Sequence, residues 1–252
     1  MYLVGRNQPL ADYGLEEGFR VLKEAGGDAV ELCHEHPLMS ADRMSTEYAR
    51  EVASMLQRVG LRASAAGWHC DYVGKDDAFA ALPGLIELTP AYGTDVFIIA
   101  GAWGDDAALW DPMVTRTREL CNVAEERGVR LAVEYEPGFL ITDADGLLRL
   151  FEAVGSPALG ANLDLGHAFL CEDDALGAIA RLGDRIFHCH IENMCRGVHK
   201  HRLPWEGDMD LGAYIKALAA AGFDGALSLD LYGVDYAGVV GDCFAHLRPL
   251  LP

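Results

Sequence analysis

Four short apolar segments in the second half of the chain each end in a residue that can bind a metal ion. The segments read RLAVE, LGANLD, RIFHCH and GALSLD. Their last residues are Glu134, Asp164, His190 and Asp230, which lie 30, 26 and 40 residues apart. These spacings are close to the length of one strand followed by one helix. Such residues at successive strand ends would meet only in a closed parallel barrel.

Three carboxylates and one imidazole form a ligand set for a divalent cation. Burying the three carboxylates without a counter-charge would cost several kcal/mol for each of them. The mostly hard donors favour Mn²⁺ first, then Mg²⁺, and are compatible with Co²⁺, Fe²⁺ or Zn²⁺. The alternative is that each carboxylate pairs with an arginine or lysine at the barrel mouth, but few basic residues lie near these positions in the sequence.

Further polar side chains gather at the same strand ends and predict a shared polar pocket. They are Glu31, His69, Glu136, His167, Arg196, His199 and His201. A pocket of this kind suits a polyhydroxylated or keto substrate. Two substrate oxygens would chelate the cation, which would polarise a carbonyl and lower the pKa of the adjacent C–H. A carboxylate on each side would then transfer a proton by general acid–base catalysis.

Strand-like apolar runs alternate with amphipathic stretches along the whole chain. Strands are expected near residues 2–5, 28–33, 61–66, 95–100, 130–134, 159–164, 186–191 and 226–231. Helices are expected near residues 15–25, 44–59, 76–91, 108–127, 143–154, 172–182, 210–221 and 235–248. Eight strands and eight helices in alternation predict an α/β fold, a single (β/α)8 TIM barrel domain over residues 1–252. A doubly wound open sheet is the main alternative, but no G-x-G-x-x-G follows the first strand.

Alternation within the last four of these strands supports the barrel. Residues 131, 133, 161, 163, 187, 189, 227 and 229 are apolar or small and would face the helices. The residues that alternate with them would face the barrel axis and include the four candidate ligands. They are residues 132, 134, 162, 164, 188, 190, 228 and 230. The ligands would also lie at the C-terminal ends of the strands, where barrel active sites are built.

Composition excludes several classes of partner. The 20 basic and 39 acidic residues give a net charge of −19, which disfavours binding to nucleic acid or to an anionic membrane. No apolar run approaches a membrane span, and the start MYLVGRNQPL lacks the pattern of a secretory signal. Seven scattered cysteines without a C-x-x-C pair predict reduced thiols in the cytoplasm. A homo-oligomer is possible, because barrels often associate through their helices.

Five blocks together resemble the xylose isomerase-like barrel superfamily of sugar phosphate isomerases and epimerases, which also contains endonuclease IV. They are GGDAVEL, AEERGVRLAVEYEPG, LGANLDLGHA, RIFHCHIEN and HRLPWEGDMDLGAYIKALAAAGFDGALSLDL. The resemblance spans nearly the whole chain. It implies a metal bound by Glu134, Asp164, His190 and Asp230, with Glu134 and Asp230 also transferring the proton. It further implies that His167 contacts the substrate and that Arg196 orients substrate oxygens. His69, Glu136 and His201 complete the expected substrate pocket.

The chain departs from the family pattern in two places. Asp230 stands where the family has a glutamate, so its reach as a proton-transfer base is shorter by one methylene. The segment GVHKHRLPWEGD lacks the first glycine of the usual paired-glycine loop.

These observations predict a metal-dependent isomerase or epimerase acting on a carbohydrate, a keto-sugar or a polyol. A lyase or dehydratase using the same site is the alternative, since a weakened second base hinders two-sided epimerisation. A non-catalytic homologue or partner subunit is also open, with Asp230 as the mark of a decayed site. Nucleic-acid repair as in endonuclease IV would use His199 and His201 as extra metal ligands, but the acidic charge disfavours it.

Overall fold

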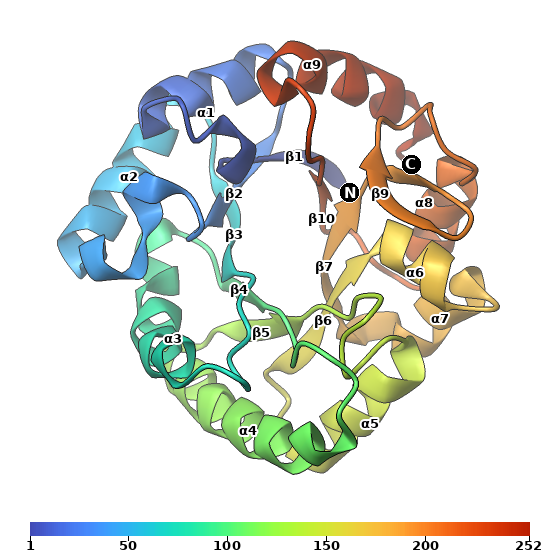
Figure 1. Ribbon diagram of the computed structural model, residues 1–252. Helices are drawn as coiled ribbons and strands as arrows, with labels where there is room; N and C mark the ends of the chain where they lie inside the picture. Colours follow the sequence, from blue (N-terminus) through green and yellow to red (C-terminus); the bar gives the residue numbers. More distant parts are fainter.

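The computed structural model describes residues 1–252 and contains a closed barrel of eight parallel strands (Figure 1). The barrel strands are β1 (Tyr2–Arg6), β2 (Ala29–Cys33), β3 (Ala63–Trp68), β4 (Val96–Ile99), β5 (Arg130–Val133), β6 (Leu159–Asp164), β7 (Ile186–Ile191) and β10 (Ala226–Leu229). They follow one another around the barrel in chain order, and β10 closes it by pairing with β1. The predicted (β/α)8 fold is confirmed.

A ring of helices surrounds the barrel (Figure 1). The helices between and after the strands are α1 (Leu15–Glu24), α2 (Thr46–Val59), α3 (Asp76–Leu88), α4 (Trp110–Arg127), α5 (Ala144–Val154), α7 (Ala175–Leu182), α8 (Leu211–Ala220) and α9 (Tyr236–Leu247). Each lies where the sequence predicts one, with ends shifted by a few residues. No helix combines the length and the apolar character needed to cross a membrane.

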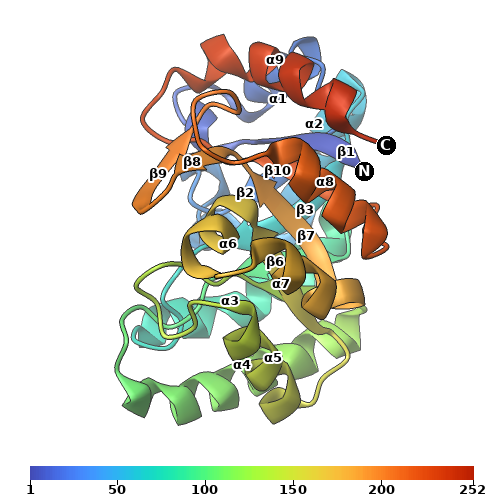
Figure 2. The same cartoon turned by 90° about the vertical axis from the view of Figure 1, so that its right-hand side faces the viewer.

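Two elements near the predicted ligands were not expected. Helix α6 (Leu165–Cys171) follows β6 without a loop, and strands β8 (Asn193–Cys195) and β9 (Val198–Arg202) form an antiparallel hairpin after β7. The hairpin turns at Gly197, whose φ of +73° is a left-handed conformation that glycine adopts without strain. Figure 2 shows the hairpin projecting from the end of the barrel opposite to the two termini.

Side-chain alternation in the barrel strands agrees with the prediction in all but one position. Leu131, Leu163 and Cys189 belong to the large core cluster, which includes buried residues of the surrounding helices. Ala132, in contrast, packs inside the barrel with residues of β3 and β4. Phe187 was expected to face the helices but packs against that inner cluster. The cause is a β-bulge, because Ile186 and His188 pair with consecutive residues of β6 and leave Phe187 as the extra residue.

Packing between the barrel and its helices should be the main source of stability. Leu131 on β5 is fully buried, so Leu131→Ala should lower the free energy of unfolding by about 2–5 kcal/mol through lost burial and a residual cavity. Urea unfolding followed by circular dichroism measures the change. Leu176→Ala is the control, because Leu176 is 40% exposed and should shift the midpoint little. Equal effects of the two changes would contradict the assignment of the core.

Candidate functional site

The four predicted ligands converge inside the C-terminal end of the barrel. Their strands β5, β6, β7 and β10 are neighbours, and all four side chains are buried. Nδ1 of His190 lies 3.4 Å from Oε2 of Glu134, 3.8 Å from Oδ2 of Asp164 and 3.6 Å from Oδ2 of Asp230. One imidazole nitrogen therefore faces one oxygen of each carboxylate.

This arrangement fits a divalent cation. Bonds of about 2.1 Å in octahedral or tetrahedral geometry separate neighbouring ligand atoms by about 3.0–3.4 Å, slightly less than the distances from His190 Nδ1. Glu134, Asp164 and His190 each offer a ligand atom within 4.8 Å of the other two, whereas Asp230 forms such a group with Asp164 and His201, so Asp230 would have to move closer to bind the same cation. Oδ2 of Asp164 is buried and has no hydrogen-bond partner, which is costly for a carboxylate oxygen. A cation among the four groups would supply the missing partner.

Glu31 orients the ring of His190 by contacting Nε2, the nitrogen that does not face the other candidate ligands. Nε2 of His190 lies 3.0 Å from Oε2 of Glu31, an outer carboxylate of the kind that fixes the ring of a metal-binding histidine. Burial alone would lower the pKa of His190, but the carboxylates of Glu31 and Glu134 outweigh it and raise that pKa to about 10. A cation would displace the proton from Nδ1, so binding should release a proton.

Arg6, at the end of β1, is a buried partner of these carboxylates that the sequence analysis missed. Its Nη1 donates to Oδ1 of Asp230, and its Nε lies 3.1 Å from Oε1 of Glu31. Nη1 also donates to the hydroxyl of Tyr232 at 2.8 Å. The expectation that few basic groups lie near the ligands was wrong for Asp230, because strand β1 closes the barrel beside β10. One oxygen of Asp230 pairs with arginine while the other faces His190.

A fifth carboxyl group, that of Glu192, lies buried beside the ligands and was not predicted. Neither of its oxygens has a hydrogen-bond partner. Burial and the charge of Asp164 raise the pKa of Glu192 well above its usual range, which indicates a neutral carboxyl group. Any Cβ at position 166 would overlap this carboxyl, so Gly166 allows α6 to pack over it.

A cavity of about 400 Å³ opens above the predicted ligands. Its walls consist almost entirely of polar and ionisable side chains. The lining residues are Arg6, Gln8, Glu35, His69, Glu134, Glu136, His167, His190, His199, His201, Asp230 and Tyr232. The structure thus brings together four of the five predicted substrate contacts. Among them, Nε2 of His69 lies 3.1 Å from Oε2 of Glu136. A larger hollow of about 770 Å³ lies at the other end of the barrel and contains none of the candidate ligands.

Arg196, the fifth predicted substrate contact, does not reach this cavity. It lies in the turn of the β8–β9 hairpin, where its Nη1 donates to the carbonyl oxygen of Phe169 at 2.7 Å. Its guanidinium lies 4.0 Å from the centre of the Phe169 ring. The hairpin therefore directs this side chain onto α6, whereas the two histidines of β9, His199 and His201, line the cavity.

Comparisons with known proteins agree with this architecture. Residues 19–247 match the family described as xylose isomerase-like TIM barrel. Fructoselysine 3-epimerase of Escherichia coli O157:H7 is 22% identical over 235 residues, which cover 86% of this chain and 85% of that protein. The structure of the probable 3-DHS dehydratase of Bacillus anthracis superposes with a TM-score of 0.84 at 17% identity. The superposition covers 98% of this chain and 99% of the dehydratase chain. A xylose isomerase-like TIM barrel protein of Mycobacterium smegmatis, solved in complex with magnesium, has a TM-score of 0.81 at 19% identity over 99% and 96% of the two chains.

The ion pairs of Arg6 should be essential for the stability of the folded protein when no cation is bound. Arg6→Met leaves Glu31 and Asp230 buried without their partner, and it should lower the free energy of unfolding by about 3–5 kcal/mol in the presence of a chelator. Adding Asp230→Asn should recover part of this loss. Urea unfolding with EDTA and then with Mn²⁺ gives the values, and the loss should be smaller with Mn²⁺.

Arg20→Met is the control for that measurement. Arg20 pairs with Glu16 on the surface of α1, where solvent weakens the attraction, so its removal should change the midpoint little. If Arg6→Met were no worse than Arg20→Met, Arg6 would not balance the buried carboxylates.

Proposed function

The chain belongs to the xylose isomerase-like TIM barrel family, and we propose that it is a divalent-metal-dependent isomerase or epimerase acting on a sugar, keto-sugar or polyol. Its relatives in sequence include epimerases and dehydratases, so the chain is an enzyme of this family. The observation that carries the proposal is the convergence of Glu134, Asp164 and Asp230 on Nδ1 of His190, with a buried oxygen of Asp164 left unpartnered.

These four residues would hold the cation, for which Mn²⁺ and Mg²⁺ are the first candidates. The neighbour solved with magnesium supports a hard cation. When bound, the cation would polarise a substrate carbonyl and make the adjacent C–H more acidic. The remaining steps depend on the protein's own side chains.

Glu134 is the favoured general base. Its Oε2 accepts from Nδ2 of Asn162 at 2.8 Å, and its Oε1 lies 3.3 Å from Nδ1 of His167. Burial would raise the pKa of Glu134, but His190 and His167 lower it well below its usual range, so the carboxylate is ionised. It can take a proton from the carbon next to the carbonyl and return it to the neighbouring atom.

The cavity supports a polyhydroxylated substrate. His69 with Glu136, and His167 with His201, present donors and acceptors that can bind hydroxyl groups. At the rim, Trp103 and Phe139 lie with ring centres 5.9 Å apart, and Phe139 is 5.7 Å from His69. Trp103 is 44% exposed and offers an apolar face for the C–H side of a sugar ring.

The chemistry of the chain supports a cytoplasmic enzyme with a small-molecule substrate. All seven cysteines are free thiols, as expected in a reducing compartment. The excess of acidic residues argues against nucleic acid as a substrate.

A screen over ketoses, inososes and keto-glycosides tests the proposal. Chelation should abolish turnover and Mn²⁺ should restore it. Glu134→Gln keeps the size of the side chain but removes the base, so kcat should fall by about 100-fold to 10,000-fold. Asp105→Asn in the exposed loop after β4 is the control and should leave kcat unchanged. Turnover that survives both chelation and Glu134→Gln would rule out this function.

A lyase or dehydratase is the second candidate, and the pairing of Arg6 with Asp230 favours it. Arg6 occupies Oδ1 of Asp230, and Oδ2 faces His190 and the candidate cation, so neither oxygen of Asp230 is free to take a proton from a substrate. The site would then have one effective base, Glu134, on one side of the substrate. Removal of a proton followed by loss of a β-leaving group needs only that base, whereas epimerisation needs proton transfer on both faces.

Reactions in D₂O separate the two candidates. A lyase should produce an enone or enol chromophore together with the released leaving group. An epimerase should instead give an isomeric product that carries deuterium at the inverted carbon and has no new absorbance. Deuterium on the inverted carbon would exclude the lyase for that substrate.

A further inference from the structure

The hairpin of β8 and β9 is buried at its base and exposed at its tip. At the base, Asn193 is 2% exposed, and its Nδ2 donates to the carbonyl oxygen of Pro204 at 2.8 Å. Residues 196–200, which form the tip, are all exposed. The core therefore holds the base in place, whereas the position of the tip depends on the side-chain contacts that the tip itself makes.

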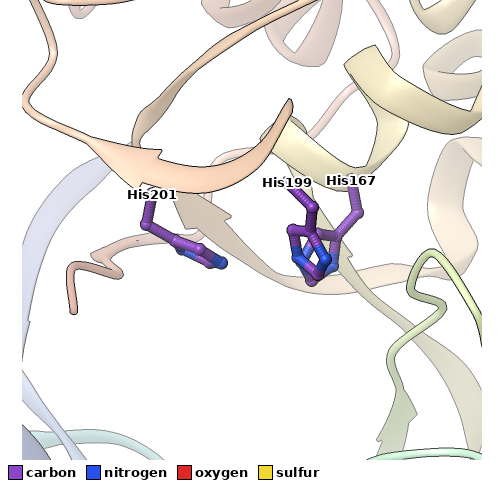
Figure 3. Close-up of side chains that lie close together, drawn as sticks. All are labelled: His167, His199 and His201. Carbon is purple, nitrogen blue, oxygen red and sulfur yellow. The ribbon is translucent and has the colours of Figure 1, made fainter. Parts of the chain in front are cut away.

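Two such contacts join the tip to helix α6. Nη1 of Arg196 donates to the carbonyl oxygen of Phe169 at 2.7 Å, and the guanidinium lies 4.0 Å from the centre of the Phe169 ring. Nε2 of His199 lies 3.0 Å from Nε2 of His167, and Figure 3 shows the two rings close together.

The contact of Arg196 suits the end of a helix. Phe169 lies in the last turn of α6, where carbonyl oxygens receive no donor from the helix itself. A cation at this end of a helix is also favourable because the helix dipole is negative there. The planar guanidinium can donate to the carbonyl and stack on the ring at the same time.

We propose that Arg196 is a positioning residue, which holds the tip of the hairpin on α6 and thereby fixes His199 in the wall of the cavity. His199 lines the cavity, whereas Arg196 does not. Arg196 thus acts on the cavity through His199 and not by contact with a substrate. This role does not depend on which reaction the site catalyses.

The effect of the tip reaches the candidate base. His199 contacts His167, and Nδ1 of His167 lies 3.3 Å from Oε1 of Glu134. Movement of the tip would therefore remove a hydrogen bond from the histidine that neighbours Glu134.

His201, the other cavity histidine of β9, has a support of its own. Its Nδ1 donates to the carbonyl oxygen of Asp230 at 2.9 Å, and its side chain is 11% exposed. Release of the tip should therefore displace His199 and leave His201 in place. This difference separates the positioning of His199 from a general loosening of the hairpin.

Imidazole ¹H–¹⁵N spectra of the protein without substrate test this role, with signals assigned from single histidine variants. Arg196→Met removes the hydrogen bond and the stacked cation, so the signals of His199 and His167 should shift or broaden while those of His201 change little. Arg196→Lys should restore part of the wild-type spectrum, because its ammonium group can still donate to Phe169. Val198→Thr is the control: Val198 is 45% exposed on the same tip, and its replacement should leave all three histidines unchanged.

Cleavage by endoproteinase Lys-C after Lys200 measures how often the tip leaves α6. Arg196→Met should raise the cleavage rate by about 10-fold, the factor expected for loss of one hydrogen bond from a charged group. Phe169→Leu should raise it as well, and the double variant should show less than the product of the two effects, because both changes break one contact. Val198→Thr should be cut at the wild-type rate, and circular dichroism checks that each variant is folded.

Three results would overturn the proposed role of Arg196. The first is a His199 signal that is unchanged in Arg196→Met, or cleavage of that variant no faster than that of Val198→Thr. The second is equal displacement of His199 and His201, which would mean that Arg196 stabilises the hairpin as a whole. The third is a double variant in which the effects of Arg196→Met and Phe169→Leu multiply. None of these measurements involves turnover, so a failure of the metal-dependent reaction proposed above would not alter them.

Discussion

Five carboxyl groups lie buried in the C-terminal half of the barrel, and the arrangement of the site follows from the need to balance their charge. Glu31 and Asp230 share the guanidinium of Arg6. Glu134 accepts from Asn162, and Glu192 is held in its neutral form by burial and by Asp164. Among the other four groups, Asp164 alone keeps a buried oxygen with no partner. A cation beside Asp164 completes this balance, and the histidines around it can gain or lose protons as the cation leaves or binds.

The fold could be predicted from the sequence because strand periodicity is visible in single segments and the number of alternating strands and helices indicates a closed barrel. Alternation along four strands correctly placed Glu134, Asp164, His190 and Asp230 on the inner face. The same reasoning failed at Phe187, because a bulge is a property of a strand pair and is not visible in one strand. Helix α6 and the β8–β9 hairpin are too short for their periodicity to stand out.

The site was less predictable than the fold. Arg6 is the last residue of β1, just as each candidate ligand lies at the end of its own strand. A search of strand ends for basic residues as well as for metal ligands would therefore have found it. Glu192 follows His190 by two residues, and its role depends on Gly166 of α6. Arg196 was expected in the pocket because the family resemblance places an arginine six residues after the metal-binding histidine, but the hairpin turn directs it onto Phe169. Spacing predicts where the backbone lies only while the intervening segment keeps one regular form.

Asp164 begins helix α6 as well as facing His190. Its Oδ1 accepts from the backbone N–H of His167 at 2.7 Å, which caps the helix, and its Oδ2 faces the candidate cation. A glutamate would carry equally suitable ligand oxygens, but it is a poor N-cap because of its extra methylene. Asp164→Glu would therefore keep a ligand oxygen and lose the helix cap, so one residue type serves two roles at this position, whereas Asp230 caps no helix.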